Sequence, residues 1–241
     1  MPTRLPQSSG WATRHLRWRL ESRTHGGPGP SGLNRRRSGD ESEPVLDLGC
    51  GDGTTAIPEA QLGADVLGVD IARNLVEAGN KRVRELGLTN IRFQEGDACD
   101  LGPLEDHSFD LVVSIFGAMF APKPFEVAKE MVRVTRPGGH IVMGNWIPGD
   151  PTLVAQILKI SSAYSPPPPE GFVSPMTWGI ESNVVERFTA AGVPKDSVSC
   201  TRDTFVFDFD GAPAQSSQNK SGSESRTSVN ATFLRVTVTM P

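Results

Sequence analysis

The residues of this chain best suited to chemistry lie in the run Val45–Thr54, where Asp47 is followed by three alternating glycines. These glycines are Gly49, Gly51 and Gly53. Glycine lets the backbone pass close under a ligand, and a helix that follows such a loop presents free N–H groups to it. The apolar residues around Asp47 predict a short buried strand that leads into the loop. The run therefore predicts a site that holds a nucleotide-like ligand.

A second acid, Asp70, ends a second buried strand at Val66–Asp70. A carboxylate at the tip of this strand can accept hydrogen bonds from both hydroxyls of a ribose, as it does in dinucleotide-binding folds. Charged hydrogen bonds of this kind are worth about 1.5–3 kcal/mol each. The same carboxylate can instead cap the helix that follows, and the two roles are compatible.

Three further segments continue the alternation of strands and turns. Ile91–Ala98 closes on Gly-Asp-Ala and predicts a third strand ending near Asp97, although Gly-Asp is also common in ordinary turns. Ser108–Phe116 predicts a fourth strand whose end reaches the floor of the site. The Arg-Pro-Gly-Gly sequence at residues 136–139 predicts a turn before a fifth strand.

In this order, the motifs resemble those of the class I S-adenosylmethionine-dependent methyltransferases over residues 44–208. The chain is similar to the small-molecule branch, of the type found in ubiquinone and menaquinone biosynthesis. The resemblance implies S-adenosyl-L-methionine as cofactor and methyl transfer to a small molecule by in-line displacement. The residues that it assigns to the cofactor are Asp47, Gly49, Cys50, Gly51, Gly53, Asp70, Ile71, Asp97, Ala98, Ser114 and Phe116.

Strand and helix patterns alternate along the chain, which indicates an α/β fold with a parallel sheet. Helical spacing predicts helices at residues 54–62, 74–86, 124–134 and 151–163, and residues 197–208 and 231–239 predict the last two strands. With the resemblance, these elements predict a Rossmann-like, doubly wound, seven-stranded sheet. We expect it to be mostly parallel, with an antiparallel last strand and helices on both faces.

The acceptor site follows less directly from the sequence. Trp146 comes after the fifth strand, and Tyr164 and Trp178 flank a stiff proline-rich loop. We expect these side chains to line a pocket for an apolar acceptor, with plain core packing as the alternative for each. A hydroxyl acceptor usually needs a base whose pKa lies near the working pH. No histidine falls at the pocket end of the predicted sheet, so no catalytic residue is named.

Charge and cysteine content limit the partners. Residues 1–43 hold eight arginines against four acidic residues, a net of +4, so the chain total of −4 leaves −8 for the remainder. An acidic main body argues against a nucleic-acid partner, and no apolar run reaches the roughly 18 residues of a membrane span. Three cysteines with unrelated spacing form neither a metal pattern nor a disulfide framework, which favours a reducing, cytoplasmic location.

The ends of the chain differ in composition from its middle. Residues 1–43 predict a disordered arginine-rich tail, with a weak likeness to a mitochondrial targeting peptide. Residues 44–241 predict one methyltransferase-like domain with a flexible polar loop at about 211–229. Nothing in the sequence indicates an oligomeric state.

Two other interpretations account for parts of the pattern. A nicotinamide-dependent dehydrogenase uses Gly-x-Gly-x-x-Gly, whereas here the third glycine falls one residue early, at Gly53. The other is a methyltransferase-like scaffold without activity, since no clear pair of helices precedes Val45 and the loop before the last strand is short. Binding of S-adenosylhomocysteine but not NAD separates the first interpretation from a methyltransferase. The scaffold would bind the cofactor weakly or not at all, so micromolar binding argues against it.

Overall fold

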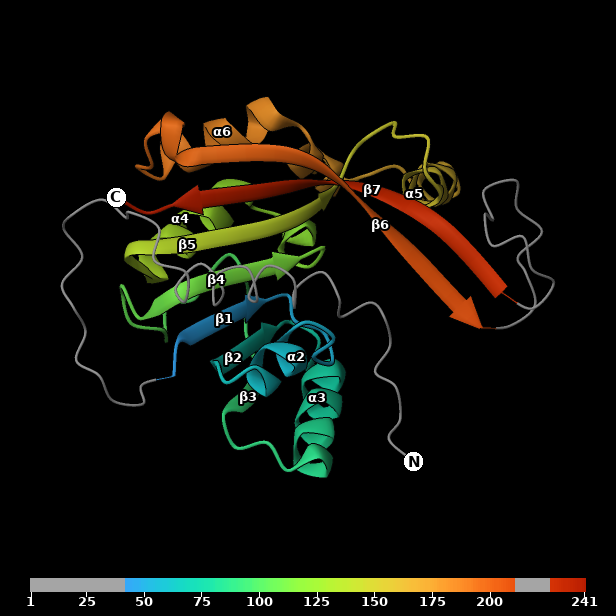
Figure 1. Ribbon diagram of the computed structural model, residues 1–241. Coiled ribbons are helices and arrows are strands. Elements are labelled where there is room, and N and C mark those ends of the chain that lie inside the picture. Colours follow the sequence, from blue (N-terminus) through green and yellow to red (C-terminus); the bar gives the residue numbers. More distant parts are fainter. Residues whose placement is uncertain (1–41, 211–225) are drawn as a thin grey trace, which may run out of the picture.

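The structure, a computed structural model, describes residues 42–210 and 226–241. Its centre is a seven-stranded sheet in the order β3-β2-β1-β4-β5-β7-β6, shown in Figure 1. Neighbouring strands from β3 to β5 are parallel, whereas β7 runs antiparallel to both β5 and β6. The predicted mostly parallel sheet with an antiparallel last strand is confirmed.

The elements follow the predicted alternation. The strands are β1 (Pro44–Leu48), β2 (Asp65–Asp70), β3 (Ile91–Glu95), β4 (Phe109–Ile115), β5 (Thr135–Trp146), β6 (Val198–Asp210) and β7 (Arg226–Thr239). The α-helices are α2 (Ala56–Gln61), α3 (Arg73–Leu86), α4 (Pro124–Val134), α5 (Leu153–Ala163) and α6 (Glu181–Ala190). Short 3₁₀ helices are η2 (Ala118–Phe120), η3 (Pro175–Gly179) and η4 (Lys195–Ser197).

Helices cover both faces of the sheet, as predicted, and divide its core into two clusters. On one face, Ile57 of α2 and Val83 of α3 pack with Val66 and Phe93 of the sheet. On the other, Met131 of α4 and Phe188 of α6 belong to the larger cluster. The helices thus bury the apolar stripes that the helical spacing indicates.

Three features differ from the prediction. β7 begins at Arg226, because β6 and β7 pair as far as Asp210↔Arg226, so residues 226–229 are strand and not loop; residues 211–225 lie outside the described part. The Arg-Pro-Gly-Gly sequence lies within β5, where the register with β4 shifts. Helix α6 was not predicted, because its ten residues bury only three side chains.

Other predictions concern residues that the structure describes only in part. The predicted tail at residues 1–43 lies outside the described residues except for Ser42 and Glu43. In residues 42–210 and 226–241, no helix combines the length and the apolar character of a membrane span. The same ranges contain no cluster of His, Cys, Asp and Glu suited to a metal ion.

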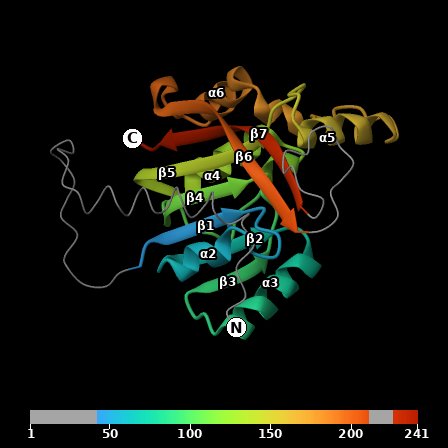
Figure 2. The ribbon, with the colours of Figure 1, turned by 45° about the vertical axis from the view of Figure 1, so that its right-hand side comes forward.

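Strands β6 and β7 extend past the rest of the sheet. The pairing of β5 with β7 stops at Trp146↔Phe233, whereas β6 and β7 remain paired through residues 204–210 and 226–232. We call these two segments the arm. At about 3.3 Å per residue, the arm projects about 20 Å beyond β5. Figure 2 shows it crossing the edge at which β1, β2 and β4 end.

Candidate functional site

Most of the candidate residues lie at one edge of the sheet, where the parallel strands β1 to β4 end. In open α/β sheets, ligands bind outside this edge, at the point where the strand order reverses. Here that point lies between β1 and β4, which are direct neighbours. The loop after β1 is the glycine loop, residues 49–53, and it meets the start of η2 after β4.

The two loops are in contact through glycine backbones. A Cβ atom added to Gly49 would lie 2.6 Å from the Cα atom of Gly117. Ser114 holds the same junction from the interior: its hydroxyl donates to the Leu48 carbonyl at 2.6 Å and accepts from the Ala118 N–H at 2.9 Å. Because Ser114 is buried and bonded to both loops, its observed role is to position them.

A first cavity of about 290 Å³ opens beside this junction, at the ends of β2 and β3. Its walls include five of the residues assigned to the cofactor, namely Gly49, Asp70, Ile71, Asp97 and Ala98. Residues Gly117–Ala118 and Phe120–Pro122 complete the wall. The structure therefore brings together five of the predicted cofactor residues from the ends of three strands, β1, β2 and β3.

Asp70 ties the glycine loop to the start of α3. One carboxylate oxygen accepts from the Gly51 N–H and the other from the Ala72 N–H, each at 2.8 Å. Asp70 does not cap α3, because the residue at the N-cap is Ala72 and no side chain caps the helix; Asp70 lines the first cavity. Each oxygen has a second lone pair, so both remain able to accept from a ligand.

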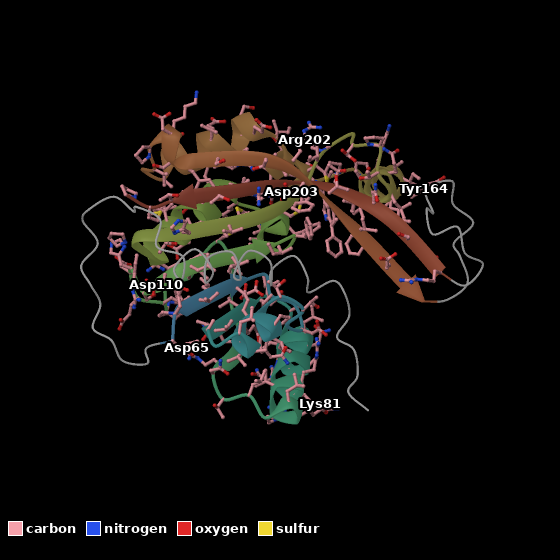
Figure 3. All side chains as sticks on the ribbon, viewed as in Figure 1. Asp65, Lys81, Asp110, Tyr164, Arg202 and Asp203 are labelled. Atoms are coloured by element: carbon pink, nitrogen blue, oxygen red, sulfur yellow. The ribbon has the colours of Figure 1, made fainter. Side chains whose placement is uncertain are left out.

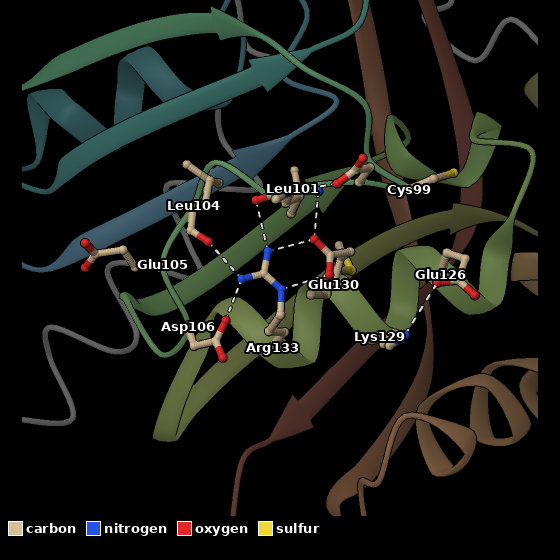
Figure 4. A network of polar contacts seen from close by, with 12 residues as sticks. Cys99, Leu101, Leu104, Glu105, Asp106, Glu126, Lys129, Glu130 and Arg133 are labelled. Carbon is tan, nitrogen blue, oxygen red and sulfur yellow. Dashed lines mark hydrogen bonds and ion pairs between the residues drawn. The ribbon is translucent and has the colours of Figure 1, made fainter.

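Asp97 begins a segment that is anchored to α4 by a polar network, shown in Figure 4. Its carboxylate accepts from the Cys99 N–H at 2.8 Å, as the ordinary turn alternative requires. Arg133 then donates to the Leu101 and Leu104 carbonyls and forms ion pairs with Asp106 and Glu130. The network fixes the path of the chain immediately after Asp97.

A second cavity, also of about 290 Å³, lies on the other side of the glycine loop. Gly49 lines both cavities, so the two meet there. The floor of the second cavity consists of residues 49–52, 54 and 55, together with Ile115. Its remaining walls are the aromatic rings of Phe116, Phe205, Phe207 and Phe233.

Phe116 has an unusual backbone conformation for a bulky residue. Its φ of 59° lies in the left-handed region, which costs about 1–3 kcal/mol for a residue other than glycine. The ring stacks on Trp146, with centroids 3.7 Å apart, and meets Phe233 edge-on at 5.5 Å. Strain of this kind is often found at functional sites, and here it directs an aromatic ring into the second cavity.

Two buried acids lie beneath the glycine loop. Asp47 and Glu59 of α2 are each 1% exposed, and each has one carboxylate oxygen without a hydrogen-bond partner. Burial raises the pKa of Asp47 to about 7, with a smaller contribution from the nearby charge of Asp70. Burial and the charge of Asp47 raise the pKa of Glu59 as well.

Cys50 lies in the glycine loop and lines the second cavity, but it is nearly buried. Its surroundings disfavour a thiolate. Burial, followed by the charges of Asp47 and Asp70, strongly raises the pKa of the Cys50 thiol. Since the thiolate is the reactive form, the surroundings of Cys50 do not suit a nucleophile.

Several predicted residues lie away from the two cavities. Gly53 packs against Phe93. Trp146 stacks on Phe116 and lines neither cavity. Tyr164 is 86% exposed at the end of α5, where Figure 3 labels it on the outside of the molecule. Trp178 is 1% exposed, and the Arg187 guanidinium of α6 lies over its ring, 4.4 Å from the centroid.

Sequence reasoning missed the phenylalanines that enclose the second cavity from the arm side. Phe205 and Phe207 alternate along β6, a pattern that by itself indicates only a strand with one apolar face. Phe233 lies in β7 and is almost fully buried. The feature that would have revealed them is the length of β6 and β7, which places part of their apolar face beyond the end of β5.

Comparison with known proteins identifies the central part of the chain. Residues 46–143 match the family model described as a methyltransferase domain. A demethylmenaquinone methyltransferase of Geobacillus stearothermophilus is 37% identical over 133 residues, which cover 54% of this chain and 51% of that protein. An uncharacterised protein of Mycobacterium tuberculosis is 34% identical over 166 residues, or 69% of this chain and 56% of the relative. The chain thus spans about half the length of these curated relatives.

Solved structures show the same fold. The YcgJ protein of Bacillus subtilis superposes with a TM-score of 0.57 at 21% identity, covering 83% of this chain and 93% of that one. A putative sarcosine dimethylglycine methyltransferase from Galdieria sulphuraria superposes with a TM-score of 0.56 at 17% identity, covering 83% and 64%. At these identities the likeness concerns the fold alone.

Proposed function

The chain belongs to the class I S-adenosylmethionine-dependent methyltransferase family, and on this premise we propose that it transfers a methyl group to a small apolar acceptor. The observation that carries the proposal is the pair of cavities that meet at Gly49. One has carboxylates at its walls and the other has aromatic rings. A polar nucleoside and an apolar acceptor need this combination side by side.

The residues present fit the cofactor. In the first cavity, Asp70 would accept from the ribose hydroxyls, and Asp97 with the Ala98 N–H would contact the adenine edge. At the glycine loop, a Cβ atom added to Gly51 would meet nothing within 4 Å, so the loop leaves space beside its backbone for the methionine end. When bound, S-adenosylmethionine supplies a methyl group on a positively charged sulfur.

Among the residues that the structure describes, the second cavity has walls but no evident base. The only carboxylate among its described lining residues is that of Asp52, which is half-exposed and forms an ion pair with Arg82 at 2.8 Å. His107 and His140 lie at the opposite end of β4 and β5. The protein's contribution is therefore alignment and exclusion of water, and we propose an acceptor whose nucleophilic atom needs no base, such as a thiolate, a carbanion or a neutral amine.

Calorimetric titration with S-adenosylhomocysteine tests the proposal. We expect the wild-type chain to bind it in the micromolar range and Asp70→Asn to bind at least about tenfold more weakly, because charged hydrogen bonds are lost. Asp65→Asn is the matched control, since Asp65 begins the same strand at its far end (Figure 3). A folded wild-type chain that binds no S-adenosylhomocysteine would instead support the inactive scaffold.

A further inference from the structure

The arm carries a continuous apolar face. Residues opposite one another in an antiparallel pair share a face, and the register places Phe205 opposite Ala231 and Phe207 opposite Val229. Phe233 continues this face toward the sheet. The alternate residues of β6 point the other way, and Val206 among them is 44% exposed. One side of the arm is therefore mostly apolar, with Thr227 as a polar residue on the same face.

The protein leaves two rings of this face partly uncovered. Val229 and Ala231 are buried, whereas Phe205 and Phe207 are only half-buried, and their rings meet edge-on with centroids 4.8 Å apart. Both rings line the second cavity together with Gly51 and other residues of the glycine loop. Displacement of water from apolar surface of this kind by an apolar ligand favours binding.

From this arrangement we infer that Phe205 and Phe207 determine acceptor specificity: they form the wall against which an apolar ring of the acceptor packs. The inference rests on the proposed methyl transfer. It extends that function because the selecting residues come from the arm and not from the region of Trp146, Tyr164 and Trp178. Aromatic rings favour other rings in stacked or edge-on contact, which selects cyclic over open-chain acceptors.

The test uses 1-naphthol as probe, titrated calorimetrically into the full chain saturated with S-adenosylhomocysteine. Wild type binds the probe, and Phe205→Ala and Phe207→Ala each weaken its binding by about tenfold, as loss of an aromatic contact and its buried area predicts. Phe207→Leu, which keeps most of the apolar volume, weakens it less. Val206→Ala, on the outer face of the same strand, leaves it unchanged.

Affinity for S-adenosylhomocysteine distinguishes a failure of the inference about the acceptor wall from a failure of the methyltransferase proposal. All four variants should retain binding of S-adenosylhomocysteine, because Asp70 and Asp97 lie in the first cavity, which contains no arm residue. If wild type does not bind S-adenosylhomocysteine, the methyltransferase proposal itself is overturned. If wild type binds S-adenosylhomocysteine but not 1-naphthol, or if the alanine variants bind both normally, the arm is not the acceptor wall. Circular dichroism confirms folding, and Phe207→Leu decides the outcome if an alanine variant does not fold.

Discussion

The backbone of Gly117 lies against that of Gly49, the residue at which the two cavities meet. The two glycines are required for different reasons. Gly49 has a φ of 72°, which disfavours any side chain. Gly117 has a φ of −97°, which every residue can adopt, so only the contact with Gly49 excludes a side chain there.

Gly117→Ala tests this contact without adding backbone strain, because alanine readily adopts the φ of Gly117. The added methyl group must push the two loops apart, which we expect to lower the free energy of unfolding by about 1–3 kcal/mol and to weaken S-adenosylhomocysteine binding. Urea denaturation and calorimetry measure the two effects. Gly102→Ala is the control, because its Cβ would meet only the end of the Asp100 side chain, at 3.0 Å. Wild-type behaviour of Gly117→Ala would show that the loops can separate freely.

The buried acids beneath the loop predict a pH dependence of stability. The pKa of Asp47 is raised from 3.8 to about 7 in the folded chain, so the folded state binds more protons than the unfolded state between these values. Stability contributed by protonated Asp47 is complete below pH 4 and is lost as the pH rises toward 7. The shift corresponds to at most about 4 kcal/mol.

Asp47→Asn removes this titration while keeping an oxygen that can accept from the Ala56 N–H. Relative to wild type, we expect the variant to gain stability as the pH is raised from 4 to 8. Chemical denaturation at several pH values measures this difference. Asp65→Asn, at the exposed start of β2, should show no such trend. A constant difference between Asp47→Asn and wild type would mean that Asp47 is ionised throughout the range.

Arg133 is predicted to stabilise the segment that follows Asp97. Arg133→Met removes hydrogen bonds to two carbonyls and ion pairs to two carboxylates. We expect a loss of about 2–3 kcal/mol in denaturation experiments, together with weaker S-adenosylhomocysteine binding because Asp97 loses its support. Lys129→Met is the control on the same helix, since its ion pair with Glu126 is exposed and 3.9 Å long (Figure 4). Equal effects of the two substitutions would argue against a special role for the network.

The strand ends of the candidate site could be predicted because their signals are local. Asp70 ends a short buried strand and Gly49 directly follows another, and parallel strands bring their carboxyl ends to one edge whatever the distant parts of the chain do. The same local signal was incomplete for Ser114. The sequence places Ser114 near the end of β4 correctly, but only the structure shows that the Ser114 hydroxyl forms hydrogen bonds with the backbones of Leu48 and Ala118.

The acceptor side could not be predicted in the same way. Whether a half-buried ring such as Phe207 faces the core or a cavity depends on how far β6 and β7 stay paired beyond β5, and periodicity does not contain that length. Trp178 shows the converse case. It is aromatic and flanks the proline-rich loop, but α6, which the sequence analysis does not predict, places Phe188 and Arg187 against it.

The position of β7 between β5 and β6 has a consequence for synthesis of the protein. β6 emerges from the ribosome before β7, yet it has no partner in the sheet until β7 has been made. Until then the edge of β5 is also unpaired, and open strand edges promote association between chains. The glycine loop and its supporting strands can fold early, whereas the aromatic wall closes only in the final step. The first cavity can therefore form in a nascent chain before the aromatic wall of the second cavity does.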